Sequence, residues 1–163
     1  MKVGLLTLGC DKNTVDSERY LAELIAHGAE STTDLDEAEV IIVNTCGFID
    51  AAKRESIDAI VGAGRYKSDG VCQAVIAVGC LVQRHKDELA EALPEVDLFL
   101  GAAEADRLIP ELKEAGFHLS DRYLLRVSES KLSIALWCTH IYPHASRRVT
   151  DTWPGVRRAW ERM

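Results

Sequence analysis

Residues 40–47 of the chain have the sequence Val40-Ile41-Ile42-Val43-Asn44-Thr45-Cys46-Gly47. Four consecutive β-branched residues are typical of a strand that is buried on both faces, as strands are in a parallel sheet. A cysteine and a glycine follow directly where this strand should end. The stretch therefore predicts a strand over 39–45 in the interior of a parallel sheet, with Cys46 in the loop at its carboxyl end.

Strand and helix signals alternate along the first 117 residues. Apolar and β-branched runs predict strands over residues 2–8, 39–45, 73–79 and 96–100. Apolar residues at helical spacing predict helices over residues 15–27, 49–63, 83–93 and 104–115. Strands that alternate with helices through short connections indicate an α/β fold, with a doubly wound, flavodoxin- or Rossmann-like parallel sheet and helices on both faces.

Composition divides the chain into two parts. The 163 residues carry a net charge of −7, which argues against direct nucleic-acid binding because phosphate recognition needs a basic face. No apolar run is long enough to span a membrane. Residues 1–117 contain 22 acidic and 11 basic side chains, whereas residues 118–163 contain four and eight. We therefore expect an α/β domain over 1–117 and an irregular basic tail over 118–163, where we assign no fold.

Three of the five cysteines occupy equivalent positions in this pattern. Cys10, Cys46 and Cys80 each follow a predicted strand directly, and each has a glycine beside it. Because the carboxyl ends of parallel strands meet at one edge of the sheet, these thiols are expected to lie together. Cysteine thiolates hold iron–sulfur clusters. Three ligands on a four-iron cluster would leave one iron open for chemistry.

Other roles for these cysteines remain open. Cysteine is a small apolar residue that is often simply buried in a core, and a zinc site completed by His85 is a further alternative. Cys72 precedes its strand and is expected at the opposite edge, away from the other three. Cys138, with two nearby histidines, is interpreted as incidental. An odd number of cysteines and no export signal argue against a disulfide framework and predict a cytoplasmic protein.

The residues around the three cysteines form distinctive stretches. The first is Leu8-Gly9-Cys10-Asp11-Lys12-Asn13-Thr14-Val15-Asp16-Ser17-Glu18. The second is Val43-Asn44-Thr45-Cys46-Gly47-Phe48-Ile49-Asp50, which continues through Ala52-Lys53 to Glu55-Ser56-Ile57. The third is Gly79-Cys80-Leu81-Val82-Gln83-Arg84, with Pro94-Glu95-Val96-Asp97 and Gly101 after it. In order and spacing, the three stretches over residues 1–117 resemble the motifs of the radical methylthiotransferases.

This resemblance implies a cofactor and a reaction. The N-terminal domain of that family carries an auxiliary 4Fe-4S cluster on three cysteines, which correspond to Cys10, Cys46 and Cys80. The full-length family enzyme cleaves S-adenosylmethionine at a second cluster and converts a C–H bond to C–SCH3. Lys12 and the run Gly47-Phe48-Ile49 resemble the RimO-type branch, whose substrate is an aspartate of a ribosomal protein. The tRNA-adenosine-modifying branch is the alternative within the family.

The resemblance ends near residue 117. The second cluster of the family is held by a CxxxCxxC motif, and none occurs in these 163 residues. We therefore expect a transferase domain that is inactive by itself. A truncated or out-of-frame end would explain the different composition of the tail. Two alternatives from other classes are a flavodoxin-like module that binds a nucleotide or a partner and has structural cysteines, and a non-functional fragment.

Overall fold

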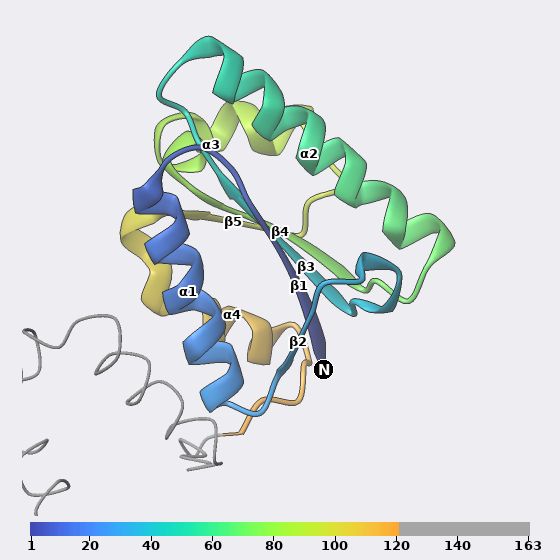
Figure 1. Cartoon of the computed structure of the whole chain (residues 1–163). Helices are drawn as coiled ribbons and strands as arrows, with labels where there is room; N and C mark the ends of the chain where they lie inside the picture. The colour runs from blue at the N-terminus through green and yellow to red at the C-terminus, as the bar shows by residue number, and fades with distance from the viewer. Residues whose placement is uncertain (121–163) are drawn as a thin grey trace, which may run out of the picture. The chain divides into compact units, whose positions relative to one another are not determined.

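The structure is a computed structural model that describes residues 1–120 (Figure 1). Those residues form one parallel sheet in the order β2-β1-β3-β4-β5. The strands are β1 (Lys2–Thr7), β2 (Glu30–Thr32), β3 (Val40–Thr45), β4 (Ala74–Gly79) and β5 (Leu98–Gly101). The helices are α1 (Asp11–Ala26), α2 (Asp50–Asp69), α3 (Cys80–Ala92) and α4 (Leu108–Glu114), with short 3-10 helices η1 (Leu35–Glu37) and η2 (Ala102–Arg107). The predicted tail, including Cys138 and its neighbouring histidines, lies almost wholly outside the described residues.

Helices cover both faces of the sheet, which confirms the predicted α/β fold. Helices α1 and α4 lie on one face, and α2 and α3 lie on the other (Figure 1). Strand β3 shows why the fold needs both layers. Ile42 packs with the side chains of α1 and α4, whereas Ile41 packs with those of α2 and α3, and both are fully buried. Within residues 1–120, no helix has the length and apolar content needed to cross a membrane.

The structure corrects several predicted boundaries. Strand β2 was not predicted, because Glu30-Ser31-Thr32 has no apolar residue and pairs only with β1 at the edge of the sheet. Helix α1 begins at Asp11 rather than at residue 15, and α3 begins at Cys80 rather than at residue 83. The first turn of α1 is polar, so apolar periodicity begins after it, whereas Leu81 and Val82 in the first turn of α3 continue the apolar run of β4. The predicted helix over 104–115 is divided between η2 and α4.

The strand order places a topological switch point between β1 and β3. From β1 the chain crosses to β2 on one side, whereas from β3 it crosses to β4 on the other. In open α/β sheets, ligands bind outside the carboxyl ends of the strands at such a point. The loop with Cys10 follows β1 and the loop with Cys46 follows β3, so these two cysteines flank the switch point.

A buried polar cluster holds the loops after β1 and β3 together. The Asn13 side-chain amide donates to the carbonyl of Leu8 (2.7 Å) and to the carbonyl of Thr45 (3.1 Å), one from each loop. The Asn44 side-chain amide donates to the backbone carbonyl of Asn13 (2.9 Å) and to Oγ of Ser17 (2.9 Å). Because Asn13, Asn44 and Ser17 are all buried, these bonds form where water does not compete. They fix the two loops relative to each other and to helix α1.

A hydrogen bond from the last residue of β3 holds the loop that follows β4. The Thr45 hydroxyl donates to the carbonyl of Val78 (2.6 Å), just before Gly79 and Cys80. Gly79 has φ 103° and ψ −160°, a backbone conformation essentially restricted to glycine. A Cβ at this position would lie 2.6 Å from the carbonyl oxygen of Thr45. Glycine is therefore required for the sharp turn that brings Cys80 directly from the strand into helix α3.

Helix α2 supports the backbone of Cys46. The backbone N–H of Cys46 donates to Oγ of Ser56 (3.0 Å), and the same hydroxyl donates to the carbonyl of Cys46 (3.1 Å). Ser56 is fully buried and Cys46 is nearly so. One hydroxyl thus satisfies both backbone polar groups of a cysteine that follows a sheet strand but has left the hydrogen-bonded ladder.

We predict opposite effects on stability for two glycine substitutions. Gly79→Ala should lower the free energy of unfolding by about 1–3 kcal/mol, because alanine is strained at this φ and its Cβ would meet backbone atoms. Gly62→Ala in α2 is the matched control. It meets no atom within 4 Å and should raise stability by about 0.5–1 kcal/mol through helix propensity. Urea denaturation followed by circular dichroism checks both values, and equal midpoints for the two variants would contradict the assignment.

We also predict that Ser56→Ala destabilises the chain by about 1–3 kcal/mol, because the Cys46 N–H and carbonyl would stay buried without their partner. Ser31→Ala on the edge strand β2 removes an exposed hydroxyl and should change stability by less than about 0.5 kcal/mol. The same denaturation experiment compares them. A Ser56→Ala variant as stable as Ser31→Ala would show that the Cys46 loop does not depend on this hydroxyl.

Candidate functional site

The three cysteines that follow β1, β3 and β4 line one cleft. The cleft has a volume of about 520 Å³ and lies at the carboxyl edge of the sheet. Cys10 is exposed, Cys46 is buried and Cys80 is half-buried, so the thiols line it at different depths. The geometric expectation from the strand-end pattern is therefore met, since residues far apart in sequence reach one cleft. Their role as ligands stays a prediction.

Glycine allows the first loop to approach the second closely. Gly9 has φ 94°, and a Cβ added there would lie 2.7 Å from Sγ of Cys46. Any other residue would therefore fill the space beside this sulfur and strain the backbone. The backbone next to Cys10 forms part of the wall around the Cys46 thiol, and the missing side chain leaves that sulfur accessible to the cleft.

Two of the thiols lie at helix N-termini. Cys10 is the N-cap of α1, and its carbonyl accepts from the backbone N–H of Asn13 (2.9 Å), while its side chain makes no capping bond. Cys80 is the first residue of α3. The N-terminus of a helix carries partial positive charge, which favours thiolates and anionic ligands. Sequence periodicity placed both cysteines in loops before these helices, whereas the structure makes them part of the helix starts.

The charged side chains of the cleft are Lys12, Glu55 and Arg84. Lys12 lies 2.5 Å from Oδ2 of Asp16 through its Nζ, and this hydrogen bond raises the pKa of the lysine above its usual value. The same Nζ lies 4.0 Å from Sγ of Cys80. Arg84 donates from Nη1 to the carbonyl of Gly47 (3.3 Å). The lining residues are therefore two cations and one anion, and Asp16 beside Lys12 offsets part of this positive charge.

The remaining lining of the cleft is largely apolar. Phe48 and Ile49 are strongly exposed, with 84% and 55% of their surfaces accessible, although both are large hydrophobic residues. Ala51 and Ala52 follow them in the first turn of α2. Small and apolar side chains therefore make up much of the cleft wall beside its three charged residues.

The donor set of the cleft is three thiols, the ligand type that iron–sulfur clusters use. Within residues 1–120, no group of three or more His, Cys, Asp and Glu side chains is placed to hold one ion. His85, the candidate fourth ligand of a zinc site, pairs with Glu88 (3.2 Å) and does not line the cleft. The ligands of a cluster bind different iron atoms, so they need not converge on one point. Three thiols around a cleft with a glycine wall and two helix N-termini suit such an anionic group.

Cys72 lies apart from the other cysteines, as the sequence predicts. It is buried in the core between the sheet and the α2–α3 layer, and its Sγ contacts the carbonyl of Ala74 at 3.4 Å. Burial raises the pKa of this thiol. Both facts assign Cys72 a packing role.

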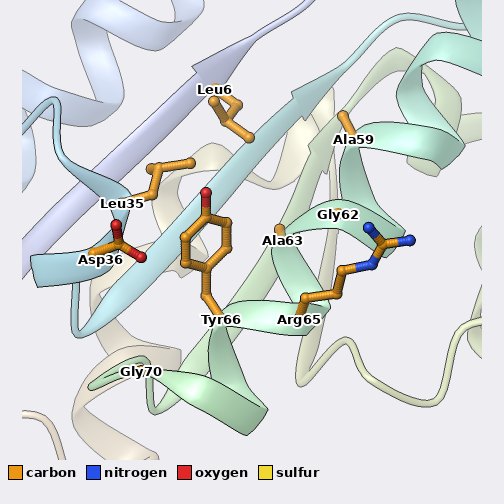
Figure 2. A pocket seen from close by; sticks show the side chains of 9 residues that line it. All are labelled: Leu6, Leu35, Asp36, Ala59, Gly62, Ala63, Arg65, Tyr66 and Gly70. Carbon is orange, nitrogen blue, oxygen red and sulfur yellow. The ribbon is translucent and has the colours of Figure 1, made fainter.

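A second cavity of about 440 Å³ lies along α2, outside the cysteine cleft. Figure 2 shows Tyr66 extending from α2 toward Leu6 and Leu35, with the charged side chains Asp36 and Arg65 at the sides. This cavity lies where only the short helix η1 connects β2 to β3. Its lining includes no cysteine or histidine, so it adds no candidate metal ligand.

Sequence reasoning missed the buried polar residues that support the cleft. Ser17 lies inside α1, where its hydroxyl accepts from the Asn44 amide and from the Thr7 hydroxyl (2.7 Å). Ser56 was quoted as part of a motif without a role. The available signal was the small polar residues of the first two motifs, such as Asn13 near Cys10 and Asn44 near Cys46.

Comparison with known proteins gives the family. Residues 2–101 match the family described as "Uncharacterized protein family UPF0004". The chain is 49% identical over 113 residues to "Ribosomal protein uS12 methylthiotransferase RimO" of Clostridium botulinum (strain Eklund 17B / Type B), an alignment of 69% of this chain and 25% of that protein. Proteins of the same name are 48% identical over 108 residues in Symbiobacterium thermophilum (66% and 22%) and 45% over 128 residues in Trichlorobacter lovleyi (78% and 28%).

The aligned region contains the whole described α/β sheet and all three cysteine loops. The chain spans about a quarter of the length of the curated relatives that it matches. The three motifs, the fold and these identities agree with one another. The chain belongs to the family UPF0004, the N-terminal domain family of the radical methylthiotransferases.

Proposed function

We propose that the chain is the cluster-binding domain of a RimO-type methylthiotransferase, in which Cys10, Cys46 and Cys80 hold an auxiliary 4Fe-4S cluster. The observation that carries this proposal is that these three thiols line one cleft at the switch point of the sheet. The glycine at position 9 and the two helix N-termini support it. The relatives are named for the methylthiotransferase activity, so the same cleft is the natural site for a cofactor of that activity.

The residues of this chain would bind and shield the group. Cys46 is the deepest thiol, and Ser56 fixes its backbone, while Cys10 and Cys80 close the cleft from two helix starts. The bound cluster would supply an iron without a protein ligand, at which a sulfur group can bind. Phe48 and Ile49 provide an apolar rim that limits access of water from their side.

We propose that the wider activity requires more residues than the part described here. The relatives act on ribosomal protein uS12 according to their names, and we propose that this chain serves a cytoplasmic enzyme with the same kind of substrate, an aspartate side chain. No CxxxCxxC motif occurs among the chain's five cysteines. We therefore propose that cleavage of S-adenosylmethionine requires residues that these 163 do not contain, and that they do not transfer a methylthio group alone.

A second candidate is a flavodoxin-like binding module with structural cysteines. The observation in its favour is the strand order β2-β1-β3-β4-β5, which flavodoxin-like proteins share and which places their ligand at the same switch point. A tRNA-modifying enzyme is the alternative within the family, and the names of the relatives favour the ribosomal protein.

Anaerobic reconstitution of the 163-residue chain with iron and sulfide tests the cluster proposal. We expect about four irons per chain and a broad absorption typical of a cubane cluster. Cys46→Ala should lose most of this iron, whereas Cys72→Ala is the matched control and should keep it, because Cys72 lies outside the cleft.

Two results would reject the proposal. One is a folded wild-type chain that takes up no iron, and the other is equal loss of iron in Cys46→Ala and Cys72→Ala. Titration of the metal-free chain with a flavin distinguishes the second candidate. Saturable, stoichiometric flavin binding that survives replacement of all three cleft cysteines by serine would favour a flavodoxin-like module.

A further inference from the structure

We propose that Lys12 sets the reduction potential of the cluster by placing a fixed positive charge beside the ligand Cys80. This inference rests on the proposed cluster site and adds a role for a residue that does not ligate the metal. An ammonium group beside a thiolate ligand stabilises the more negative, reduced state of the cluster, because the reduced state carries one more electron. Lys12 should therefore make the cluster easier to reduce.

The geometry that carries the proposal joins two helices on opposite faces of the sheet. Nζ of Lys12, in the first turn of α1, lies 4.0 Å from Sγ of Cys80, the first residue of α3. Asp16, one turn along α1, holds the ammonium group through Oδ2 at 2.5 Å. The lysine is thus oriented across the cleft toward a sulfur that is 68 positions away in the sequence.

The charge distribution makes this cation unusual for the domain. Acidic residues outnumber basic ones two to one over residues 1–117, yet Lys12 and Arg84 both line the cysteine cleft against the single acidic residue Glu55. Arg84 donates to the carbonyl of Gly47, and this contact directs its guanidinium to the backbone. Lys12 is the cation with a contact to a thiol, so its charge should act on the cluster most directly.

Because the Lys12 side chain is partly exposed, its effect on the reduction potential should depend on salt. Its side chain is 56% accessible, and exposed charges are screened by salt. The influence of Lys12 on the potential should therefore be largest at low ionic strength and should shrink as salt is added. A purely structural role for Lys12 would show no such dependence.

Lys53 provides a matched control. It also lies in the first turn of a helix and pairs with an aspartate on the same helix, Asp50, at 3.2 Å. Unlike Lys12, it does not line the cleft. Replacing Lys53 removes the same charge from the molecule while leaving the surroundings of the cysteines unchanged.

The experiment is a redox titration of the reconstituted 163-residue chain, followed by electron paramagnetic resonance. Lys12→Met should shift the potential to a more negative value at low salt, and the shift should decrease at high salt. Lys12→Arg should restore a potential close to that of the wild type, and Lys53→Met should leave it unchanged.

Three results would overturn the inference. A Lys12→Met potential equal to that of the wild type, or a shift equal to that of Lys53→Met, would show that the charge at position 12 has no local effect. Loss of iron in both Lys12 variants would assign the residue a structural role instead. A wild-type chain that takes up no iron overturns the cluster proposal itself, so the two failures are distinct.

Discussion

The side-chain amide of Asn13 is the constraint on which the arrangement of this molecule most depends. It bridges the carbonyl of Leu8 and the carbonyl of Thr45, so it joins the chain as it leaves β1 to the chain as it leaves β3. A parallel sheet brings the loops after β1 and β3 to the same edge, but it does not by itself fix the distance between them. Buried hydrogen bonds convert that proximity into a fixed distance, because leaving any of these groups unpaired would cost stability.

The cluster of bonds around Asn13 extends to all three cysteine loops. The side-chain amide of Asn44 donates to the backbone carbonyl of Asn13, and the Thr45 hydroxyl donates to the carbonyl of Val78 near the end of β4. Within the described part of the chain, the side-chain carbonyl oxygens of Asn13 and Asn44 have no hydrogen-bond partner although both are buried. The amide orientations are nevertheless determined, because both Nδ2 groups donate to two acceptors. These two buried, unpaired oxygens carry a cost in stability.

Much of the fold follows directly from the sequence. The run Val40–Val43 can be buried only between two layers, and the position of each cysteine after an apolar run is enough to place three thiols at one edge. The edge strand β2 could not be found in this way, because three polar residues become a strand only when β1 is available to pair with them. The start of α1 was missed because its first turn is polar. The start of α3 was missed because Cys80, Leu81 and Val82 follow the apolar strand β4 without a polar break.

The contacts that give the site its character are those that no local pattern contains. Ser56 is ten positions from the cysteine that it supports, and Lys12 at the start of α1 lies 4.0 Å from Sγ of Cys80 at the start of α3. Both contacts depend on how the helices pack. The central claim is that three thiols together hold one cubane cluster, and the Mössbauer spectrum of the chain reconstituted with ⁵⁷Fe tests it most directly. The account predicts a four-iron cluster in which one iron differs from the other three, because it lacks a cysteine ligand. A spectrum of a single iron ion, of a two-iron cluster or of four equivalent irons would contradict it.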